Sequence, residues 1–373
     1  MKILHTSDLH LGLRLHGVSL LEEQRAMVDS LLETAGREQV GAVLISGDVF
    51  DRAVSPPEAL RLYNRLVTGL CGELGIPTVI IAGNHDGAER LAACNRLLEG
   101  AGLYIRGRLG EEREPVRVGD CVIHTLPFFN GDEARALFPQ EELHSTAQAM
   151  AYLCGREDCS SEGFHVLMAH CFVGGAALSE SDRAAAVGGA SQVPAGAFAG
   201  FDYVALGHLH RSQEVAPGVR YSGSPLQYSF GEWRQAKSVS LVDTEDGSVR
   251  EIPVPAAREL RVVTGPLEEL LEAARRDPRR EDYLKVELTD CVPTMERVEL
   301  FRAEYPNLLL VTGRQSQQAG EDGGITVEEL ERMSPEDLVR RFCREVLEEE
   351  TDEETMAWFR QAVQAVEKEG EEQ

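Results

Sequence analysis

The feature that most constrains this chain is a set of five short polar segments, each following a run of apolar residues. The segments are Asp8-Leu9-His10, Gly47-Asp48-Val49-Phe50-Asp51, Gly83-Asn84-His85-Asp86, Ala169-His170 and Gly207-His208-Leu209-His210. The apolar runs have the length and composition of buried β-strands. Because ligands of open α/β sheets collect at the carboxyl ends of strands, we expect these segments to meet at one edge of a sheet.

The apolar runs alternate with amphipathic stretches, which predicts a layered α/β domain over residues 1–255. We expect helices at residues 20–34 and 57–74, the second with proline in its first turn. Strands are expected at residues 2–6, 42–46, 78–82, 121–126, 165–169, 203–206, 219–222 and 238–242.

The pattern changes after the proline-rich turn Ile252-Pro253-Val254-Pro255. Strands at residues 260–263, 283–288 and 308–311 then alternate with helices, which predicts a small α+β cap over residues 256–312. The polar, glycine-rich stretch 313–324 predicts a flexible linker.

Residues 325–373 are predicted to form two helices with unusual properties. Their apolar faces consist of Leu338, Phe342 and Val346, and of Met356, Phe359, Val363 and Val366. Residues 321–373 also hold 18 acidic and 6 basic side chains, a net charge of −12. Short helices would leave these apolar faces exposed, so we expect them to dock on a partner or on the rest of the chain.

The net charge and the lack of targeting segments limit the class of protein. A formal charge of −26 over 373 residues argues against binding nucleic acid through the general surface. No stretch approaches the roughly 20 apolar residues of a membrane span, and the first residues lack a signal region. The eight cysteines show neither a disulfide framework nor zinc-ribbon spacing. We therefore expect a cytoplasmic protein with reduced thiols and no membrane partner.

The residue types in the five polar segments suit a pair of divalent cations. Two ions roughly 3.5–4 Å apart can activate water and stabilise both oxygens of a phosphoryl displacement. A bridging carboxylate must offset the repulsion between the ions, and Asp48 is our candidate. The remaining ligands would be Asp8, His10 and His210 on one ion, and Asn84, His170 and His208 on the other. Neighbouring glycines should let the backbone turn sharply, and the mixed imidazole and carboxylate donors favour manganese or iron over magnesium.

Taken together, the five segments resemble the complete signature of the calcineurin-like metallophosphoesterases. Three runs are similar, more narrowly, to the SbcD family of bacterial nuclease subunits: Ile3-Leu4-His5-Thr6-Ser7-Asp8-Leu9-His10-Leu11-Gly12, Gly47-Asp48-Val49-Phe50-Asp51 and Tyr221-Ser222-Gly223-Ser224-Pro225-Leu226. This resemblance covers nearly the whole chain. It implies an α/β four-layer sandwich of two mixed sheets flanked by helices, with an α+β capping domain and C-terminal helices.

The resemblance also implies an activity and partners. Such a protein uses two divalent metal ions, usually Mn2+, as a double-strand exonuclease and hairpin or single-strand endonuclease in DNA repair and recombination. It forms a homodimer and works with an SbcC-type coiled-coil ATPase, which the C-terminal helices would hold. His85 matches the histidine that assists cleavage by binding the scissile phosphate and stabilising or protonating the leaving oxygen.

Several questions stay open at this point. Some relatives carry histidine at the position of Asp51, so the role of Asp51 is open. It could either support Asp48 or guide the substrate. One alternative function is a phosphomonoesterase or small-molecule phosphodiesterase on the same scaffold, because the metal motifs are shared across many substrates. The other is a catalytically vestigial scaffold for the ATPase.

Residues outside these motifs receive structural interpretations. His5, His124 and His165 lie in predicted strands, where we expect core histidines rather than ligands. Asp86 is expected to fix its loop or orient His85, and Cys171 to be a packing residue. Three aromatic residues could either stack on bases or close the sheet edge, namely Tyr228, Phe230 and Trp233.

Overall fold

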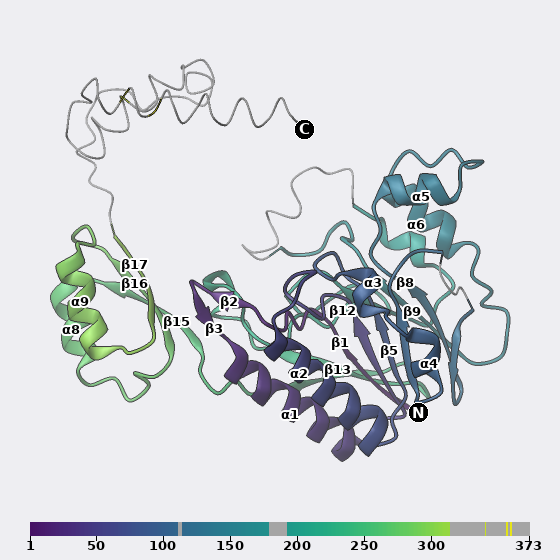
Figure 1. Ribbon diagram of the computed structural model, residues 1–373, viewed down its shortest axis with the longest axis horizontal. Coiled ribbons are helices and arrows are strands. Elements are labelled where there is room, and N and C mark those ends of the chain that lie inside the picture. Colours follow the sequence, from purple (N-terminus) through teal and green to yellow (C-terminus); the bar gives the residue numbers. More distant parts are fainter. Residues whose placement is uncertain (111–113, 179–191, 314–339, 341–355, 357–358, 360–373) are drawn as a thin grey trace. The chain divides into compact units, whose positions relative to one another are not determined.

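The computed structural model (Figure 1) describes residues 1–110, 114–178 and 192–313, together with Arg340, Met356 and Phe359. Met1–Arg314 forms one compact unit, distinct from Gln315–Gln373. Residues 314–324 of the predicted linker lie outside the described residues, as do Leu338, Phe342, Val346, Val363 and Val366 of the predicted tail helices. Met356 and Phe359 are helical, and Met356 is buried.

Two six-stranded mixed sheets form the centre of the first unit. The first has the order β14-β13-β1-β4-β5-β6 and the second β11-β12-β10-β9-β8-β7. The strands of the first sheet are β14 (Val249–Pro253), β13 (Ser238–Asp243), β1 (Lys2–Thr6), β4 (Ala42–Ser46), β5 (Thr78–Ile81) and β6 (Leu103–Arg106). Those of the second are β11 (Gln213–Ala216), β12 (Val219–Tyr221), β10 (Tyr203–Gly207), β9 (Phe164–His170), β8 (Cys121–Leu126) and β7 (Val116–Val118).

Helices cover the outer faces of both sheets, which gives the four layers that the resemblance implied. One buried cluster, including Ile3, Leu44 and Met168, lies between the sheets. On the first sheet, α1 (Leu21–Glu38) and α2 (Pro57–Val67) lie side by side over a second cluster (Figure 1). On the second sheet, α5 (Gly131–Leu137) and α6 (Thr146–Cys154) pack over a third. The predicted fold class is confirmed.

The cap follows the predicted order of strand, helix, strand, helix, strand. Its three parallel strands are β15 (Leu260–Gly265), β16 (Tyr283–Leu288) and β17 (Leu308–Gly313), and its helices are α8 (Leu267–Ala274) and α9 (Met295–Glu304). A separate buried cluster, including Leu284, Val286 and Phe301, holds them together. Arg258 connects the cap to α1 through ion pairs with Glu22 at 3.0 Å and Glu23 at 2.6 Å.

Several short strands and helices lie between the longer elements. They are β2 (Arg14–Leu15), β3 (Val18–Ser19), α3 (Ala88–Leu91), α4 (Asn95–Glu99), the 3-10 helices η2 (Ala195–Phe198) and η3 (Phe230–Glu232), and the π-helix η1 (Thr68–Glu73). The helix expected at residues 57–74 thus changes from α to π after Val67. Gly69 lies where an added Cβ would come within 2.6 Å of Leu32, so glycine lets this turn pack against α1.

The described part of the chain also bears on the state of the cysteines and on membrane spans. The seven cysteines that it contains are all free thiols. No helix within it has the length and apolar character needed to cross a membrane.

Candidate metal centre

The five polar segments meet at one edge of the paired sheets, where β1, β4, β5, β9 and β10 end. The Nε2 atoms of His10 and His210 lie 3.2 Å apart. His10 Nε2 also lies 3.9 Å from the Asp48 carboxylate. Asp8, His10 and His210 form one group of donor atoms within 4.8 Å of one another. The structure therefore brings together the residues that we predicted to hold the first ion.

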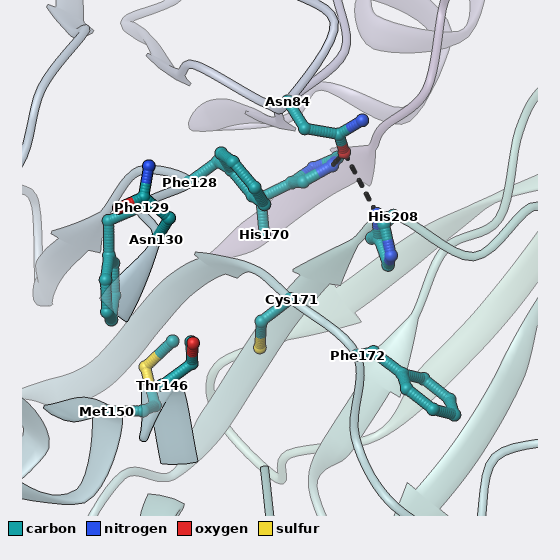
Figure 2. A pocket seen from close by; sticks show the side chains of 10 residues that line it. All are labelled: Asn84, Phe128, Phe129, Asn130, Thr146, Met150, His170, Cys171, Phe172 and His208. Atoms are coloured by element: carbon teal, nitrogen blue, oxygen red, sulfur yellow. Dashed lines mark hydrogen bonds between the residues drawn. The ribbon is translucent and has the colours of Figure 1, made fainter. Parts of the chain in front are cut away.

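A second group of donors lies on the other side of Asp48. His170 Nε2 is 3.4 Å from Asp48 Oδ2 and 3.0 Å from Asn84 Oδ1. His208 Nδ1 also lies 3.0 Å from Asn84 Oδ1 (Figure 2). Asp8, Asp48 and His170 form a compact group of their own, so Asp8 is near both sets of donors. Asp48 lies between the two sets, as a bridging ligand must.

The spacing and direction of these donors fit divalent cations. Two ligand atoms about 2.1 Å from one ion and at right angles to each other lie roughly 3 Å apart, similar to the separations here. His170 Nδ1 donates to the Ser46 carbonyl at 2.8 Å, so Nε2 points at two oxygens and offers its lone pair there once its proton is displaced. Three lone pairs that converge on one point beside the buried Asp48 and His170 favour a proton or a cation between them. The residues present therefore fit the metals that the family implies.

The backbone at this edge adopts a rare conformation at the ligands themselves. Asp8, His10, Asp48 and His208 all have positive φ, between 42° and 104°. Such residues cost free energy and cluster at functional sites, where the surrounding structure holds them in place. We infer that packing and hydrogen bonds at the sheet edge stabilise this conformation.

The glycines beside the ligands act differently from our expectation. Gly47 has φ of 89° and makes the sharp turn that we predicted. Gly83 and Gly207 do not have positive φ, so turning was the wrong reason for them. A Cβ at Gly83 would lie 2.2 Å from Asp48 Oδ1, and a Cβ at Gly207 would lie 1.8 Å from the Ser46 carbonyl oxygen. These two positions need glycine because the loops approach each other closely.

Buried partners orient two of the histidines. His210 Nδ1 lies 3.1 Å from Glu232, whose other oxygen pairs with Lys237 Nζ at 2.6 Å. His170 Nδ1 is held by the Ser46 carbonyl, as described above. Metal-binding histidines usually donate their second ring N–H to a carboxylate or carbonyl in this way. In both histidines this arrangement leaves Nε2 available for a cation.

Burial and charge set the protonation of the donors. Burial lowers the pKa of His10 and of His208 to about 3, so both rings are neutral and offer lone pairs. Burial would raise the pKa of Asp48, but the nearby His170 and other histidines hold it below its usual range. Burial raises the pKa of Asp8 to about 6, although His170 and His210 oppose the change. Burial would lower the pKa of His170, but Asp48 and Asp8 raise it to about 9, so a cation would have to displace the proton of this ring.

His85 lies beside the donors, and its ring forms a further compact group with His10 and the Asp51 carboxylate, with ligand atoms within 4.8 Å of one another. Its Nδ1 lies 2.9 Å from the Asp51 carbonyl, which leaves Nε2 available, and its side chain is exposed. Its backbone N–H donates to Asp48 Oδ1 at 2.8 Å. Its ring meets that of His10 edge-on at 4.8 Å. Asp51, whose role was open, thus contacts His85 through its carbonyl.

Asp86 fixes the loop that carries His85. Its carboxylate accepts hydrogen bonds from the backbone N–H groups of Val49, Phe50 and Gly83, at 2.9 to 3.2 Å. This ties the segments after β4 and β5 together. Our expectation that Asp86 fixes the loop is confirmed.

An open pocket of about 310 Å³ begins at the second group of donors. Asn84, His170 and His208 form one side of it, and Phe128, Phe129 and Phe172 contribute apolar surface (Figure 2). Phe128 is 37% exposed and meets His170 edge-on. Tyr228 and Phe230 are instead buried in the core over the first sheet, and Trp233 packs partly buried against the same cluster, so Tyr228 and Phe230 are not available to stack on bases.

Sequence reasoning missed three supporting residues. Glu232 and Lys237 hold His210, and the buried Gln24 joins the His10 carbonyl at 2.7 Å to the Gly12 N–H at 2.9 Å. No local pattern marks any of them, because each acts through a contact formed only on folding. The one available signal was that Gln24 interrupts the apolar face of a predicted helix.

Comparisons with known proteins agree with this geometry. The family model described as calcineurin-like phosphoesterase matches residues 1–212. The model described as the Type 5 capsule protein repressor C-terminal domain (SbcD_C) matches residues 256–346. A crystal structure of TT1561 of Thermus thermophilus is 13% identical, with a TM-score of 0.38 over 68% of this chain and 99% of that one.

Two curated relatives are similar over most of their length, and both are named as the SbcD chain of the SbcCD nuclease. The relative from Staphylococcus saprophyticus subsp. saprophyticus is 32% identical over 321 residues, which is 84% of this chain and 85% of the relative. The relative from Staphylococcus epidermidis is 31% identical over 318 residues, with the same coverage. The chain therefore belongs to the calcineurin-like phosphoesterase family and, within it, to the SbcD nuclease subunits.

Proposed function

We propose that this nuclease subunit hydrolyses DNA ends and hairpins with two Mn2+ ions, as half of a complex with an SbcC-type coiled-coil ATPase. The observation that supports this most is the convergence of donor atoms on both sides of Asp48. Family membership gives the nuclease activity and the need for divalent metal. The number and kind of ions, the DNA structures cleaved and the partner are our own extension.

In this proposal each ion has three ligands of its own and shares Asp48. Asp8, His10 and His210 would hold one ion, and Asn84, His170 and His208 the other. The four imidazoles and three oxygen donors suit Mn2+ better than Mg2+, which prefers an all-oxygen shell. When bound, two such cations activate a water for in-line attack on phosphorus and stabilise the attacking and leaving oxygens.

His85 would act on the substrate. With Nδ1 donating to the Asp51 carbonyl, protonated Nε2 can donate to a phosphate oxygen or give its proton to the leaving oxygen. The Asp51 carbonyl would fix the ring in this orientation. Asp86 would contribute indirectly, by fixing the loop on which His85 stands.

The negative net charge of the chain fits this function if DNA is held locally. Bound cations would make the sheet edge positive, and the apolar wall at Phe128 could contact a nucleotide beside the ions. The ATPase would supply most of the remaining contacts with the DNA backbone.

The partner and assembly proposals rest on the family and on the tail sequence. We propose that residues 325–373 hold the ATPase, that the subunit is a homodimer, and that the complex is cytoplasmic. The division into a nuclease domain (residues 1–255), a cap (256–312), a linker (313–324) and a partner-binding region (325–373) also stays a prediction. Deleting residues 325–373 should abolish co-purification with the ATPase and leave cleavage of small phosphodiesters unchanged.

The central experiment compares substrates with and without Mn2+. Purified chain is given a hairpin DNA, a small phosphodiester and a small phosphomonoester, and the rates are measured. We expect Mn2+-dependent cleavage of the DNA and the diester, with the monoester slowest. Preference for the monoester would identify a phosphomonoesterase, and no cleavage of any substrate would support the vestigial scaffold.

A further inference from the structure

A second cluster of potential metal ligands lies on the second sheet, away from the edge that carries the first centre. It consists of His124 on β8, His165 on β9 and Cys159 in the loop before β9, with one ligand atom from each within 4.8 Å of the others. His165 precedes His170 by five positions in β9, so the two histidines lie roughly 17 Å apart along the strand. The cluster is therefore not part of the first centre.

The outer ring nitrogens of the two histidines both face hydrogen-bond acceptors. His124 Nδ1 lies 2.8 Å from the Glu157 carboxylate, and His165 Nε2 lies 2.9 Å from the Ser161 carbonyl. A carbonyl oxygen can only accept, and an ionised carboxylate can only accept as well, so the tautomers that satisfy both contacts carry hydrogen on both outer nitrogens. The Ser161 hydroxyl also lies 3.4 Å from His165 Nε2, a longer contact than that to the Ser161 carbonyl. The two histidines are 1% and 3% exposed, so water cannot substitute for these partners.

In these tautomers the inner nitrogens face each other without a hydrogen between them. His124 Nε2 and His165 Nδ1 are 3.1 Å apart. In two neutral rings whose outer nitrogens are protonated, both inner atoms carry lone pairs directed at the same space. Such an arrangement is unfavourable in a buried site unless a cation or an additional proton lies there.

The surroundings favour a metal cation. A carboxylate on one histidine and a backbone carbonyl on the other are the partners that metal-binding histidines typically have. Cys159 adds a sulfur donor, and burial together with Glu157 and Asp158 raises the pKa of its thiol. Those carboxylates disfavour a thiolate alone but favour a divalent cation that displaces the thiol proton.

We propose that His124, His165 and Cys159 form a second metal site, which takes Zn2+ or a transition-metal ion of similar preference. Two imidazoles and a thiolate are a donor set for zinc rather than for manganese or magnesium. The fourth position would be completed by water. The site would tie the loop before β9 to the sheet, and it replaces our expectation that His124 and His165 are core histidines only.

Cobalt binding to the full-length chain tests this proposal, because a thiolate ligand gives Co2+ a near-ultraviolet charge-transfer band. The proposed ligands of the first centre include no thiolate, so its ions contribute no such band. We expect the band in the wild type and in the control Cys94→Ser, which removes an exposed thiol elsewhere. Cys159→Ser should lose the band and bind one ion fewer per chain, whereas Asp48→Ala should keep the band.

A second measurement on the unmodified chain does not depend on a variant folding. Thiol alkylation is followed by mass spectrometry with and without Zn2+, and labelling of Cys159 should slow by about tenfold or more, while labelling of Cys94 is unchanged. The absence of a thiolate band in the wild type would overturn the proposal, as would a band that survives Cys159→Ser. Equal labelling rates would do the same and would mean that the histidines share only a proton.

Discussion

Glu232→Gln tests whether the buried pair behind His210 contributes to metal binding and stability. Glu232 is fully buried, pairs with Lys237 Nζ at 2.6 Å and lies 3.1 Å from His210 Nδ1. Glutamine keeps the size of the side chain and removes its charge. The substitution therefore leaves the Lys237 ammonium buried without its carboxylate and weakens the acceptor that orients His210.

The structure gives the expected size of the effect. Burial would raise the pKa of Glu232, but His210 and Lys237 lower it from 4.5 to about 2. That difference corresponds to about 3 kcal/mol of folded-state stability, within the roughly 3–5 kcal/mol expected for breaking a buried pair. Because the folded pKa is depressed, this stabilisation is complete above pH 4.5 and is lost as the pH falls towards 2.

Urea unfolding in EDTA at neutral pH measures the loss of stability, and Mn2+ titration measures the affinity. We expect Glu232→Gln to unfold with about 3 kcal/mol less free energy and to bind Mn2+ about 10–100-fold more weakly. The double variant Glu232→Gln, Lys237→Met removes the stranded charge, so it should regain stability but not affinity. If Glu232→Gln matches the wild type in both measurements, the assigned role of Glu232 is wrong.

Four further predictions concern the centre itself. His85→Gln should keep the metal content but lose most DNA cleavage, and loss of metal in this variant would contradict the division of roles. Asp48→Ala should lose both metal and cleavage, and EDTA should stop cleavage by the wild type until Mn2+ is restored. Gly83→Ala would place a Cβ 2.2 Å from Asp48 Oδ1, so this variant should bind Mn2+ poorly and lose about 1–3 kcal/mol of stability. In the control Gly196→Ala the added Cβ meets no atom within 4 Å, so both Mn2+ binding and stability should stay as in the wild type. Mn2+ affinity should rise with pH, first up to about 6 as Asp8 loses its proton and then up to about 9 as His170 does, and calorimetry on both sides of each value should detect proton release.

The parts of the fold that could be predicted are those with a strong local pattern. β1, β4, β8 and β16 begin and end at the predicted residues, because uninterrupted or alternating apolar runs define them. The strands β6, β7, β11 and β14 were not predicted, and all four lie at sheet edges. Short edge strands such as β7, with the sequence Val-Arg-Val, become strands through pairing with a neighbour.

In the candidate site, too, only the residues marked by a local sequence pattern could be predicted. The ligand candidates could be located because they directly follow predictable strands. Their supports could not, because Glu232 and Lys237 reach His210 only through the folded chain. The reason why glycine is needed at Gly83 and Gly207 could not be predicted either, because it depends on how closely two loops approach each other in the folded chain.

His124 and His165 show a further limit. Their positions in predicted strands led us to expect both of them in the core, and they are buried as expected. Their hydrogen-bond partners Glu157 and Ser161 come from a loop, and those partners determine which ring nitrogens carry hydrogen. The chemistry of a buried histidine therefore depends on contacts that the pattern of apolar residues does not encode.

Electron paramagnetic resonance of the chain loaded with Mn2+ is the most direct test of the central claim that Asp48 bridges two ions. Ions roughly 3.5–4 Å apart are magnetically coupled, so the wild type should bind two Mn2+ per chain and give the spectrum of a coupled pair. Asp48→Ala should lose the coupled spectrum. If the wild type gives only isolated Mn2+ signals at full loading, two ions do not share Asp48 and the assigned centre is wrong.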